Sequence, residues 1–309
     1  MPELPEVQTT VDGLSKKVLK RTFIDVWSDW EKIVKKPKNF GEFKRIIKGK
    51  KIQKVWRRAK NVIFDLSDGP ALSHAEGYSL LVHQKMTGHL LIGNWKLEIG
   101  NWVPSGSGLL NDPYNRFLHL VFFLDNKEML ALSDARKFAK VELWKTEELL
   151  NSEEFNNLGP EPLEDSFTFI KFKEVLKNKK GKVKQVLMNP EIIAGIGNIY
   201  VSEILWQAKT HPEKRVEKLN SSELKLIYQS IKKVLTLGVK LGGESFSDYR
   251  KPDGSKGDFD TERKVYKREG QKCSRCGEKI KRIKVGQRSA FFCPHCQILH
   301  AKNIKSKNY

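Results

Sequence analysis

The chain has 309 residues, with 57 Lys and Arg against 37 Asp and Glu, which gives a formal net charge of +20. This length suffices for two domains, and the positive excess indicates a polyanionic partner, with nucleic acid the first candidate and an anionic membrane surface the second. No apolar run reaches the length of a membrane span and no signal peptide opens the chain, so we expect a cytoplasmic protein with no membrane partner.

The first six residues predict the start of an amphipathic helix. Pro5 suits the first turn, where a missing N–H costs no intrahelical hydrogen bond. If Met1 is trimmed, Pro2 becomes a free secondary amine beside Glu3, and such an amine can attack a carbonyl-like carbon to form an iminium. On these residues alone, an ordinary charged helix start is the alternative. The apolar stripe of the helix consists of Leu4, Val7, Val11, Leu14 and Val18.

Residues 21–66 are predicted to form short β segments interrupted by a basic patch. Lys60 directly precedes the alternating strand 61–66, where it is either a functional cation or a solvated charge at a strand edge. Residues 67–80 are expected to form an enlarged surface loop. A hairpin is predicted over 117–133, with its turn at 125–128.

A Pro- and Gly-rich segment at 158–163 marks the expected domain boundary, and the following half of the chain is predicted to be helical. The glycines around Gly197 and Asn198 precede a helix, so the backbone there can approach a phosphate closely. Residues 242–254 are polar and Gly-rich, which predicts a mobile loop. The expected helices lie at 167–178, 182–189, 198–208 and 221–241.

The four cysteines form the most specific motif of the chain. Two CxxC pairs are separated by sixteen residues, and each pair places two thiolates on one tight turn. The pattern predicts one closed, structural Zn²⁺ site. The residues between the pairs read as two strands, with Arg288 at or beside the hairpin tip. The predicted zinc ligands are Cys273, Cys276, Cys293 and Cys296.

Several separated motifs resemble the formamidopyrimidine-DNA glycosylase (Fpg) family. MPELPEV at 1–7 is similar to the family's N-terminus, HQKMTG at 83–88 to its HLGMSG, and SDARKFA at 133–139 to its DPRRFG. LGPEPL at 158–163 matches the family's interdomain hinge, and the likeness covers nearly the whole chain. Departures are Ala135 and Ala139 in place of Pro and Gly.

The resemblance implies an α+β fold. An N-terminal β-sandwich flanked by helices would precede a helix–two-turns–helix domain with a zinc-bound β-hairpin, and DNA would lie in a basic cleft between the two halves. The implied divisions are a catalytic domain at 1–150, a hinge at 151–163, a DNA-binding domain at 164–262 and a zinc finger at 263–309.

The resemblance also implies the activity. Members of the family remove oxidised purines (8-oxoguanine and formamidopyrimidines) from duplex DNA through a Schiff base on the N-terminal proline, followed by β,δ-elimination. This would make the protein a monomeric, bifunctional glycosylase and AP lyase of base excision repair. The implied catalytic residues are Pro2, Glu3, Lys60 and Arg288. The implied DNA contacts are His83, Met86, His119, Arg136, Phe138, Lys179, Lys184, Gly197, Asn198 and Tyr249.

Within this set, Met86, Arg136 and Phe138 correspond to the side chains that fill the space left by an extruded base. By residue type alone, Met86 is equally a core filler. One DNA-contacting histidine of the family aligns with Phe117, which leaves only its neighbour His119.

Two other functions remain open from the sequence. The first is a Nei-like glycosylase for oxidised pyrimidines, which Leu4 and the Met, Arg and Phe set argue against. The second is a non-catalytic nucleic-acid binder that keeps the fold and has lost the chemistry, which Pro2 and Glu3 argue against.

Overall fold

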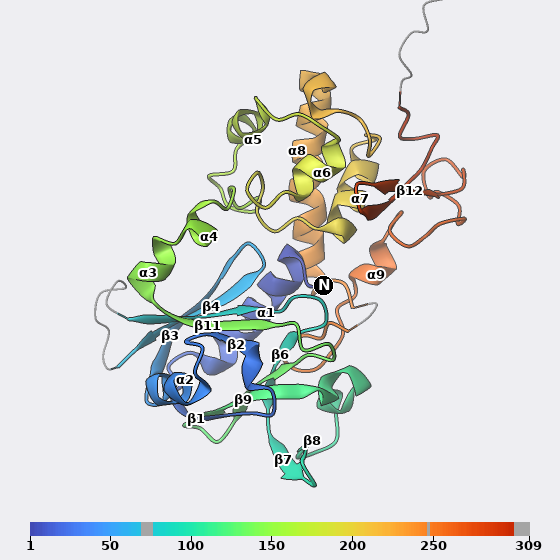
Figure 1. The fold of residues 1–309 in the computed structure, drawn as a ribbon. Coiled ribbons are helices and arrows are strands. Elements are labelled where there is room, and N and C mark those ends of the chain that lie inside the picture. Colours follow the sequence, from blue (N-terminus) through green and yellow to red (C-terminus); the bar gives the residue numbers. More distant parts are fainter. Residues whose placement is uncertain (69–76, 246–247, 300–309) are drawn as a thin grey trace, which may run out of the picture. The chain divides into compact units, whose positions relative to one another are not determined.

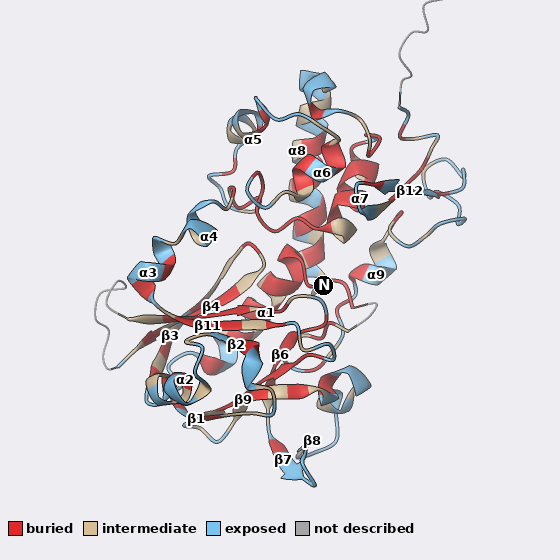
Figure 2. Ribbon diagram, in the orientation of Figure 1, coloured by how far each residue is buried: buried red, intermediate tan, exposed pale blue. Residues whose placement is uncertain are grey.

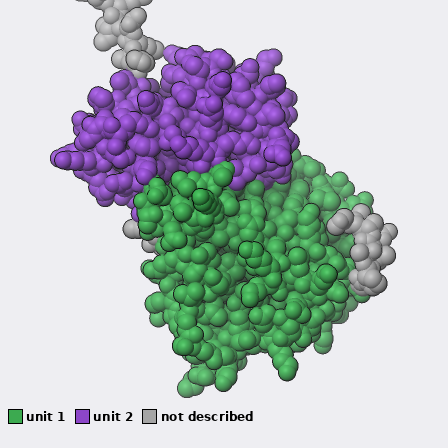
Figure 3. All heavy atoms as spheres, turned by 180° about the vertical axis from the view of Figure 1, so that it is seen from behind, with its two compact units in different colours: residues 1–158, 236–262 green, residues 159–235, 263–309 purple. Residues whose placement is uncertain are grey.

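The computed structural model describes residues 1–68, 77–245 and 248–299, so most of the predicted surface loop at 67–80 lies outside the described residues. The chain divides into two compact units (Figure 3). Unit 1 contains residues 1–158 and 236–262, and unit 2 contains residues 159–235 and 263–309. Residues 236–262, which we assigned to the DNA-binding domain, therefore group with unit 1, because this segment packs on the first helix.

Unit 1 is built mainly of antiparallel strands (Figure 1). Its strands are β1 (Phe23–Ser28), β2 (Val34–Lys36), β3 (Lys51–Arg58), β4 (Asn61–Ser67), β5 (Tyr78–His83), β6 (His89–Gly93), β7 (Trp95–Glu98), β8 (Asn101–Pro104), β9 (Leu118–Leu124), β10 (Met129–Ser133) and β11 (Lys140–Lys145). Its helices are α1 (Leu4–Val18), α2 (Phe40–Ile47), α3 (Thr146–Leu150), α4 (Glu153–Asn156) and α9 (Phe259–Glu262), with short 3-10 turns η1 (Glu31–Ile33), η2 (Leu109–Asn111) and η3 (Pro113–Arg116).

Two sheets form the predicted sandwich. The first has the order β1-β9-β10-β6, and the second has the order β2-β11-β5-β4-β3, in which only β2 and β11 run parallel. One apolar cluster joins both sheets, with Phe122 and Leu132 from the first and Phe64 and Leu80 from the second. Buried residues accordingly follow the strands of both sheets in Figure 2. The β-sandwich is thus confirmed, and β7 and β8 pair separately as a hairpin.

Helix α1 packs against β6, the edge of the first sheet, and against β3 and β4 of the second. Its predicted apolar stripe is buried throughout, from Leu4 to Val18. The helix therefore buries its apolar face in the cluster that joins the two sheets. One helix was missed: residues 40–47 form α2 rather than a β segment, because Phe43 and Ile47 are buried on one helical face and Asn39 caps the first turn.

Unit 2 begins with helices and ends with a β-hairpin. Its helices are α5 (Phe169–Leu176), α6 (Val183–Met188), α7 (Asn198–Gln207) and the first part of α8 (Ser221–Lys240), with the 3-10 turn η4 (Val216–Lys218), and its strands are β12 (Lys281–Val285) and β13 (Arg288–Phe292). Helix α7 packs against both α6 and β13. The buried Glu203 carboxyl accepts backbone N–H groups of residues 264–266, which fixes the chain leading to the hairpin. The predicted α+β fold is confirmed. Among the described residues, no helix is both long and apolar enough to cross a membrane.

Candidate functional site

The N-terminal turn of α1 lies inside unit 1. Pro2, Glu3 and Glu6 are buried, and Glu3 is only 2% exposed. Glu3 is the N-cap of the helix, and its backbone N–H donates to Oε2 of Glu6 over 2.7 Å as part of a capping box. This arrangement satisfies helix-end donors with a carboxyl group and fixes the backbone of the first turn. Two carboxyl groups are therefore held beside the first residues of the chain.

Residues far along the chain hold this turn in place. The N–H of Glu244 donates to Oε1 of Glu6 over 2.7 Å, and the hydroxyl of Tyr249 donates to the Glu6 carbonyl over 2.9 Å. Gly243 has a φ of +82°, and a Cβ there would lie 2.8 Å from the Glu6 side chain. Only glycine fits this close approach, so the segment after α8 can pack directly against the N-terminal turn.

The amine at the chain start sits in an environment suited to a nucleophile. Burial lowers the pKa of the Met1 amine, and nearby Lys60 lowers it further, while the carboxyl groups of Glu3 and Glu6 oppose the change. If Met1 is removed, the Pro2 nitrogen becomes the chain-terminal amine. A lowered pKa leaves more amine unprotonated at neutral pH. Lys60, in the turn between β3 and β4, is thus brought to the same place.

Met86, Arg136 and Phe138 lie on two neighbouring turns. The first turn connects β5 to β6 and the second connects β10 to β11, and β6 pairs with β10 while β5 pairs with β11. Met86 is 37% exposed and Phe138 is 52% exposed, so both extend into solvent rather than into the core. The Arg136 guanidinium lies 4.6 Å from the centre of the Phe138 ring. The three side chains predicted to enter the DNA are therefore adjacent and accessible.

The two predicted histidine contacts lie in different surroundings. Burial lowers the pKa of His83 to about 3, helped by Lys85 and Lys60, so its ring is neutral at physiological pH. His119 Nδ1 lies 2.8 Å from the Asp29 carboxylate at the surface of unit 1.

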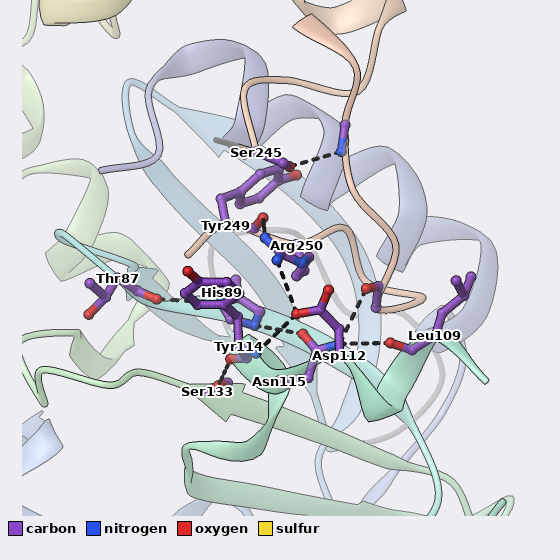
Figure 4. Close-up of polar contacts among 12 residues, drawn as sticks. Thr87, His89, Leu109, Asp112, Tyr114, Asn115, Ser133, Ser245, Tyr249 and Arg250 are labelled. Carbon is purple, nitrogen blue, oxygen red and sulfur yellow. Dashed lines mark hydrogen bonds and ion pairs between the residues drawn. The ribbon is translucent and has the colours of Figure 1, made fainter. Parts of the chain in front are cut away.

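A buried polar cluster joins the segment around η3 to the segment after α8, as Figure 4 shows. Arg250 is only 1% exposed; its guanidinium pairs with Asp112 at 3.0 Å and lies 4.6 Å from the centre of the Tyr114 ring. Asn115 bridges His89, at 3.0 Å from Nε2, and the carbonyl of Gly254, at 3.2 Å.

Sequence reasoning missed this cluster. We expected a mobile loop over 242–254, but its described residues are largely buried, since Tyr249 and Arg250 both point into unit 1. Residues 246 and 247 lie outside the described residues. The one available signal was Asp112 followed by Pro113, a typical helix cap and first helical residue, which marks η3 as an ordered turn.

In unit 2 the predicted phosphate-binding turn precedes α7. Gly197 is the N-cap of α7 and Asn198 its first residue, so the helix N-terminus has the expected place. The side-chain oxygen of Asn198 is buried, and no described residue donates to it. Lys179 is exposed, whereas Lys184 is only 1% exposed and its Nζ donates to the Ser289 carbonyl over 2.6 Å. Lys184 thus holds the β-hairpin to α6.

The four cysteines meet at one end of the hairpin. Their Sγ atoms all lie within 4.8 Å of one another, and the donor set is chemically uniform. Tetrahedral zinc–thiolate bonds of about 2.3 Å separate sulfurs by about 3.8 Å, so the cluster fits one Zn²⁺ with no ligand position left open. The indole N–H of Trp206 donates to Cys273 Sγ over 3.4 Å, which ties the cluster to α7. The site is a structural zinc centre.

The tip of this hairpin carries Arg288. Val285 pairs with Arg288 across the two-residue turn at 286–287, and the arginine side chain is exposed. Gly286 has a φ of +61°, and a Cβ there would lie 2.6 Å from the amide nitrogen of Gln185. The tip is therefore seated against α6 and presents Arg288 from a fixed turn.

Comparison with known proteins places these features in one family. Three family signatures match: the formamidopyrimidine-DNA glycosylase N-terminal domain over residues 1–141, the formamidopyrimidine-DNA glycosylase H2TH domain over 158–250, and the zinc finger found in FPG and IleRS over 270–298. The formamidopyrimidine-DNA glycosylase of Desulfitobacterium hafniense is 34% identical over 300 residues, covering 96% of this chain and 100% of its own. That of Lactococcus lactis is 35% identical over 298 residues, covering 96% and 99%.

Solved structures agree with the sequence relatives. The Lactococcus lactis Fpg bound to DNA with an abasic site matches with a TM-score of 0.81 at 34% identity, covering 96% of this chain and 100% of its own. A structure of MutM with DNA containing carbocyclic 8-oxo-G matches with a TM-score of 0.80 at 34% identity and the same coverage. Fold, zinc centre and matches together define a DNA glycosylase with an H2TH domain and a zinc finger. The chain belongs to the formamidopyrimidine-DNA glycosylase family.

Proposed function

We propose that this protein is a bifunctional DNA glycosylase and AP lyase that removes oxidised purines, such as 8-oxoguanine and formamidopyrimidines, from duplex DNA in base excision repair. The observation that carries the proposal is the N-terminal turn of α1. There the amine of Met1, whose pKa is lowered, lies near the buried Glu3 and near Lys60. A binding protein has no use for a nucleophile held in this way, so the turn favours catalysis over binding alone.

The chemistry follows from an unprotonated Pro2 amine. The Pro2 nitrogen forms a bond to C1′ of the damaged nucleotide, and the bond from C1′ to the base breaks as the base leaves with a proton. Glu3 transfers the protons needed to open the sugar ring, and ring opening leaves a Schiff base on Pro2. The iminium acidifies the C2′ proton, whose loss expels the 3′ phosphate, and a second elimination expels the 5′ phosphate. Lys60 and Arg288 would neutralise the developing phosphate charge.

Residues of both units would hold the DNA. Met86, Arg136 and Phe138 would enter the duplex at the position of the extruded nucleotide, which compensates for lost stacking. The α7 N-terminus, with Asn198 and nearby Lys179, would bind phosphates. His83, His119 and Gly197 complete the proposed set of DNA-contacting positions. Lys184 and Tyr249, which we expected to contact DNA, are buried and would act indirectly, through the hairpin and the N-terminal turn that they hold. Zinc would keep the hairpin in shape, and the enzyme would act as a cytoplasmic monomer.

Borohydride trapping tests the proposal. The protein is incubated with a duplex that contains 8-oxoguanine opposite cytosine, and sodium borohydride reduces any Schiff base to a stable adduct. We expect a covalent protein–DNA adduct whose sugar maps to Pro2, and no adduct with the undamaged duplex. Binding without an adduct on any damaged duplex would identify a non-catalytic binder. An adduct formed only with an oxidised pyrimidine would identify a Nei-like enzyme.

A further inference from the structure

The two turns that carry Met86, Arg136 and Phe138 are joined by a buried carboxyl group. Asp134 is 0% exposed and lies in the second turn, directly after β10. Thr87, in the first turn, is also buried. Both residues sit beneath the exposed side chains of the turns, and neither one is presented to solvent.

The Asp134 carboxylate accepts hydrogen bonds from both turns. Its Oδ1 accepts the hydroxyl hydrogen of Thr87, which crosses from the β5–β6 turn. Its Oδ2 accepts the backbone N–H of Ala139 over 2.7 Å, which closes its own turn. The N–H of Arg136 lies 3.2 Å from the Thr87 hydroxyl oxygen and 3.3 Å from Oδ1. The Asp134 side chain therefore links the backbone of its own turn to the Thr87 side chain of the β5–β6 turn.

The second turn that this bridge holds has an unusual composition. Ala135 and Ala139 stand where the family pattern has Pro and Gly, the residues that usually set a turn by their own backbone preferences. Lys137 nevertheless adopts a left-handed φ of +55°, and its N–H donates to the Asp134 carbonyl over 3.1 Å. Hydrogen bonds to Asp134 thus hold a conformation that the local residues do not favour by themselves.

We propose that Asp134, through Thr87, is a positioning residue that makes Met86, Arg136 and Phe138 act as one rigid wedge during base extrusion. The inference rests on the proposed function, because it assigns a step of that reaction to residues that do not touch the DNA. Buried hydrogen bonds to a carboxyl group are among the strongest in proteins, and loss of one leaves an unsatisfied buried group. Without the bridge, the two turns move independently, and the side chains of Met86, Arg136 and Phe138 no longer enter the duplex together.

The test compares Thr87→Val with Thr87→Ser. Valine keeps the shape of the side chain and removes the hydroxyl, whereas serine keeps the hydroxyl and removes a methyl group. Single-turnover excision of 8-oxoguanine from a duplex is measured beside strand cleavage at a preformed abasic site. We expect Thr87→Val to slow excision by about tenfold or more and abasic-site cleavage by less than about threefold, with Thr87→Ser close to wild type. Asp134→Asn is expected to act like Thr87→Val.

A second measurement separates positioning from general destabilisation. Fluorescence of 2-aminopurine next to the lesion reports unstacking, and Thr87→Val is expected to reduce its rise. In a Met86→Ala/Arg136→Ala/Phe138→Ala background, adding Thr87→Val is expected to change excision by less than about twofold, since no wedge side chain is left to position.

Equal excision by Thr87→Val and Thr87→Ser would overturn the proposal, as would equal losses on both substrates by Thr87→Val. A full additional loss in the wedge-deleted background would also overturn it. A wild-type protein that neither excises 8-oxoguanine nor forms a trapped adduct would instead refute the proposed function, and with it the inference.

Discussion

The N-terminal turn of α1 and the zinc hairpin are both small segments with a fixed backbone, but different interactions stabilise them. The hairpin is held by four cysteines within 24 consecutive residues and by a metal that fits between them. The turn is held by Glu6, whose partner Glu244 lies 238 residues away. A metal concentrates the stabilising free energy in one local site, whereas the turn depends on the folding of the whole of unit 1.

This difference has a practical consequence. Loss of zinc is expected to damage the hairpin and leave unit 1 intact, because the ligands all belong to unit 2. A change at the N-terminal turn is expected to remove the chemistry and leave the fold and the DNA contacts of unit 2 unchanged. Substitutions in each of the two sites can test that separation.

Blocking the removal of Met1 is expected to abolish covalent trapping. While Met1 is attached, the Pro2 nitrogen is an amide whose lone pair is delocalised, so it cannot attack C1′. The matched control is one N-terminal tag in two versions, one permanent and one cleaved by a protease to leave Pro2 first. Trapping is expected only after cleavage, with lesion-DNA affinity similar in both. A trapped sugar that maps to Lys60 in the tagged protein would contradict the proline mechanism.

Replacing a zinc ligand is expected to weaken DNA binding and protease resistance together. Structural zinc contributes on the order of 10 kcal/mol to the folding of small zinc domains, so Cys273→Ser or Cys296→Ser removes most of what orders the hairpin. Limited proteolysis is expected to cleave unit 2 near 270–298 first, while unit 1 resists. Full DNA affinity in the metal-free variant would show that the hairpin does not depend on zinc.

Removing the exposed wedge side chains is expected to slow excision from duplex DNA by about tenfold or more. Unstacking a base costs a few kcal/mol per step, and Met86→Ala and Phe138→Ala remove groups that compensate for it. Cleavage at a preformed abasic site is expected to change less. Ile99→Ala is the control, because Ile99 is fully exposed at the β7–β8 hairpin and has no proposed role. Similar losses on both substrates would make Met86 and Phe138 ordinary structural residues.

The ion pair of Arg250 and Asp112 is expected to contribute a smaller, pH-dependent stability. Burial opposes ionisation of Asp112, but hydrogen bonds from Arg250 and from the backbone of Tyr114 outweigh it and lower its pKa. A lowered carboxyl pKa stabilises the fold above the ordinary value of about 4, and this contribution is lost as the pH falls through the folded-state pKa.

Asp112→Asn is therefore expected to lower the free energy of unfolding by about 1–3 kcal/mol at neutral pH, with the difference from wild type shrinking below about pH 4. The control Asp25→Asn removes the exposed ion pair with Lys44 and is expected to change the free energy of unfolding by less than about 1 kcal/mol. Chemical denaturation across this pH range measures both. A pH-independent difference for Asp112→Asn would mean that its effect is one of packing.

Residue type and spacing specify the features whose residues are close along the chain. The zinc ligands, the start of α1, the glycine turn before α7 and the alternating strands all follow from spacing and residue type, because local geometry places such residues together in almost any fold. The resemblance to the Fpg family added the proposed roles of Pro2, Glu3 and the wedge residues, and family membership and the zinc centre were confirmed.

The contacts that hold these features in place come from residues far apart in the chain. Pairing of β6 with β10 and of β5 with β11 brings Thr87 next to Asp134. Packing of the segment after α8 on α1 brings Glu244 next to Glu6. Arginine is usually exposed, yet Arg250 is buried because Asp112 and Tyr114, from another segment, pair with its guanidinium and pack on it. Apart from the cap at Asp112, the sequence around these residues does not indicate their partners, since a buried polar group is satisfied by whatever the fold places beside it. For that reason the sequence predicted the candidate site residues, and the structure was needed to find the residues that hold them in position.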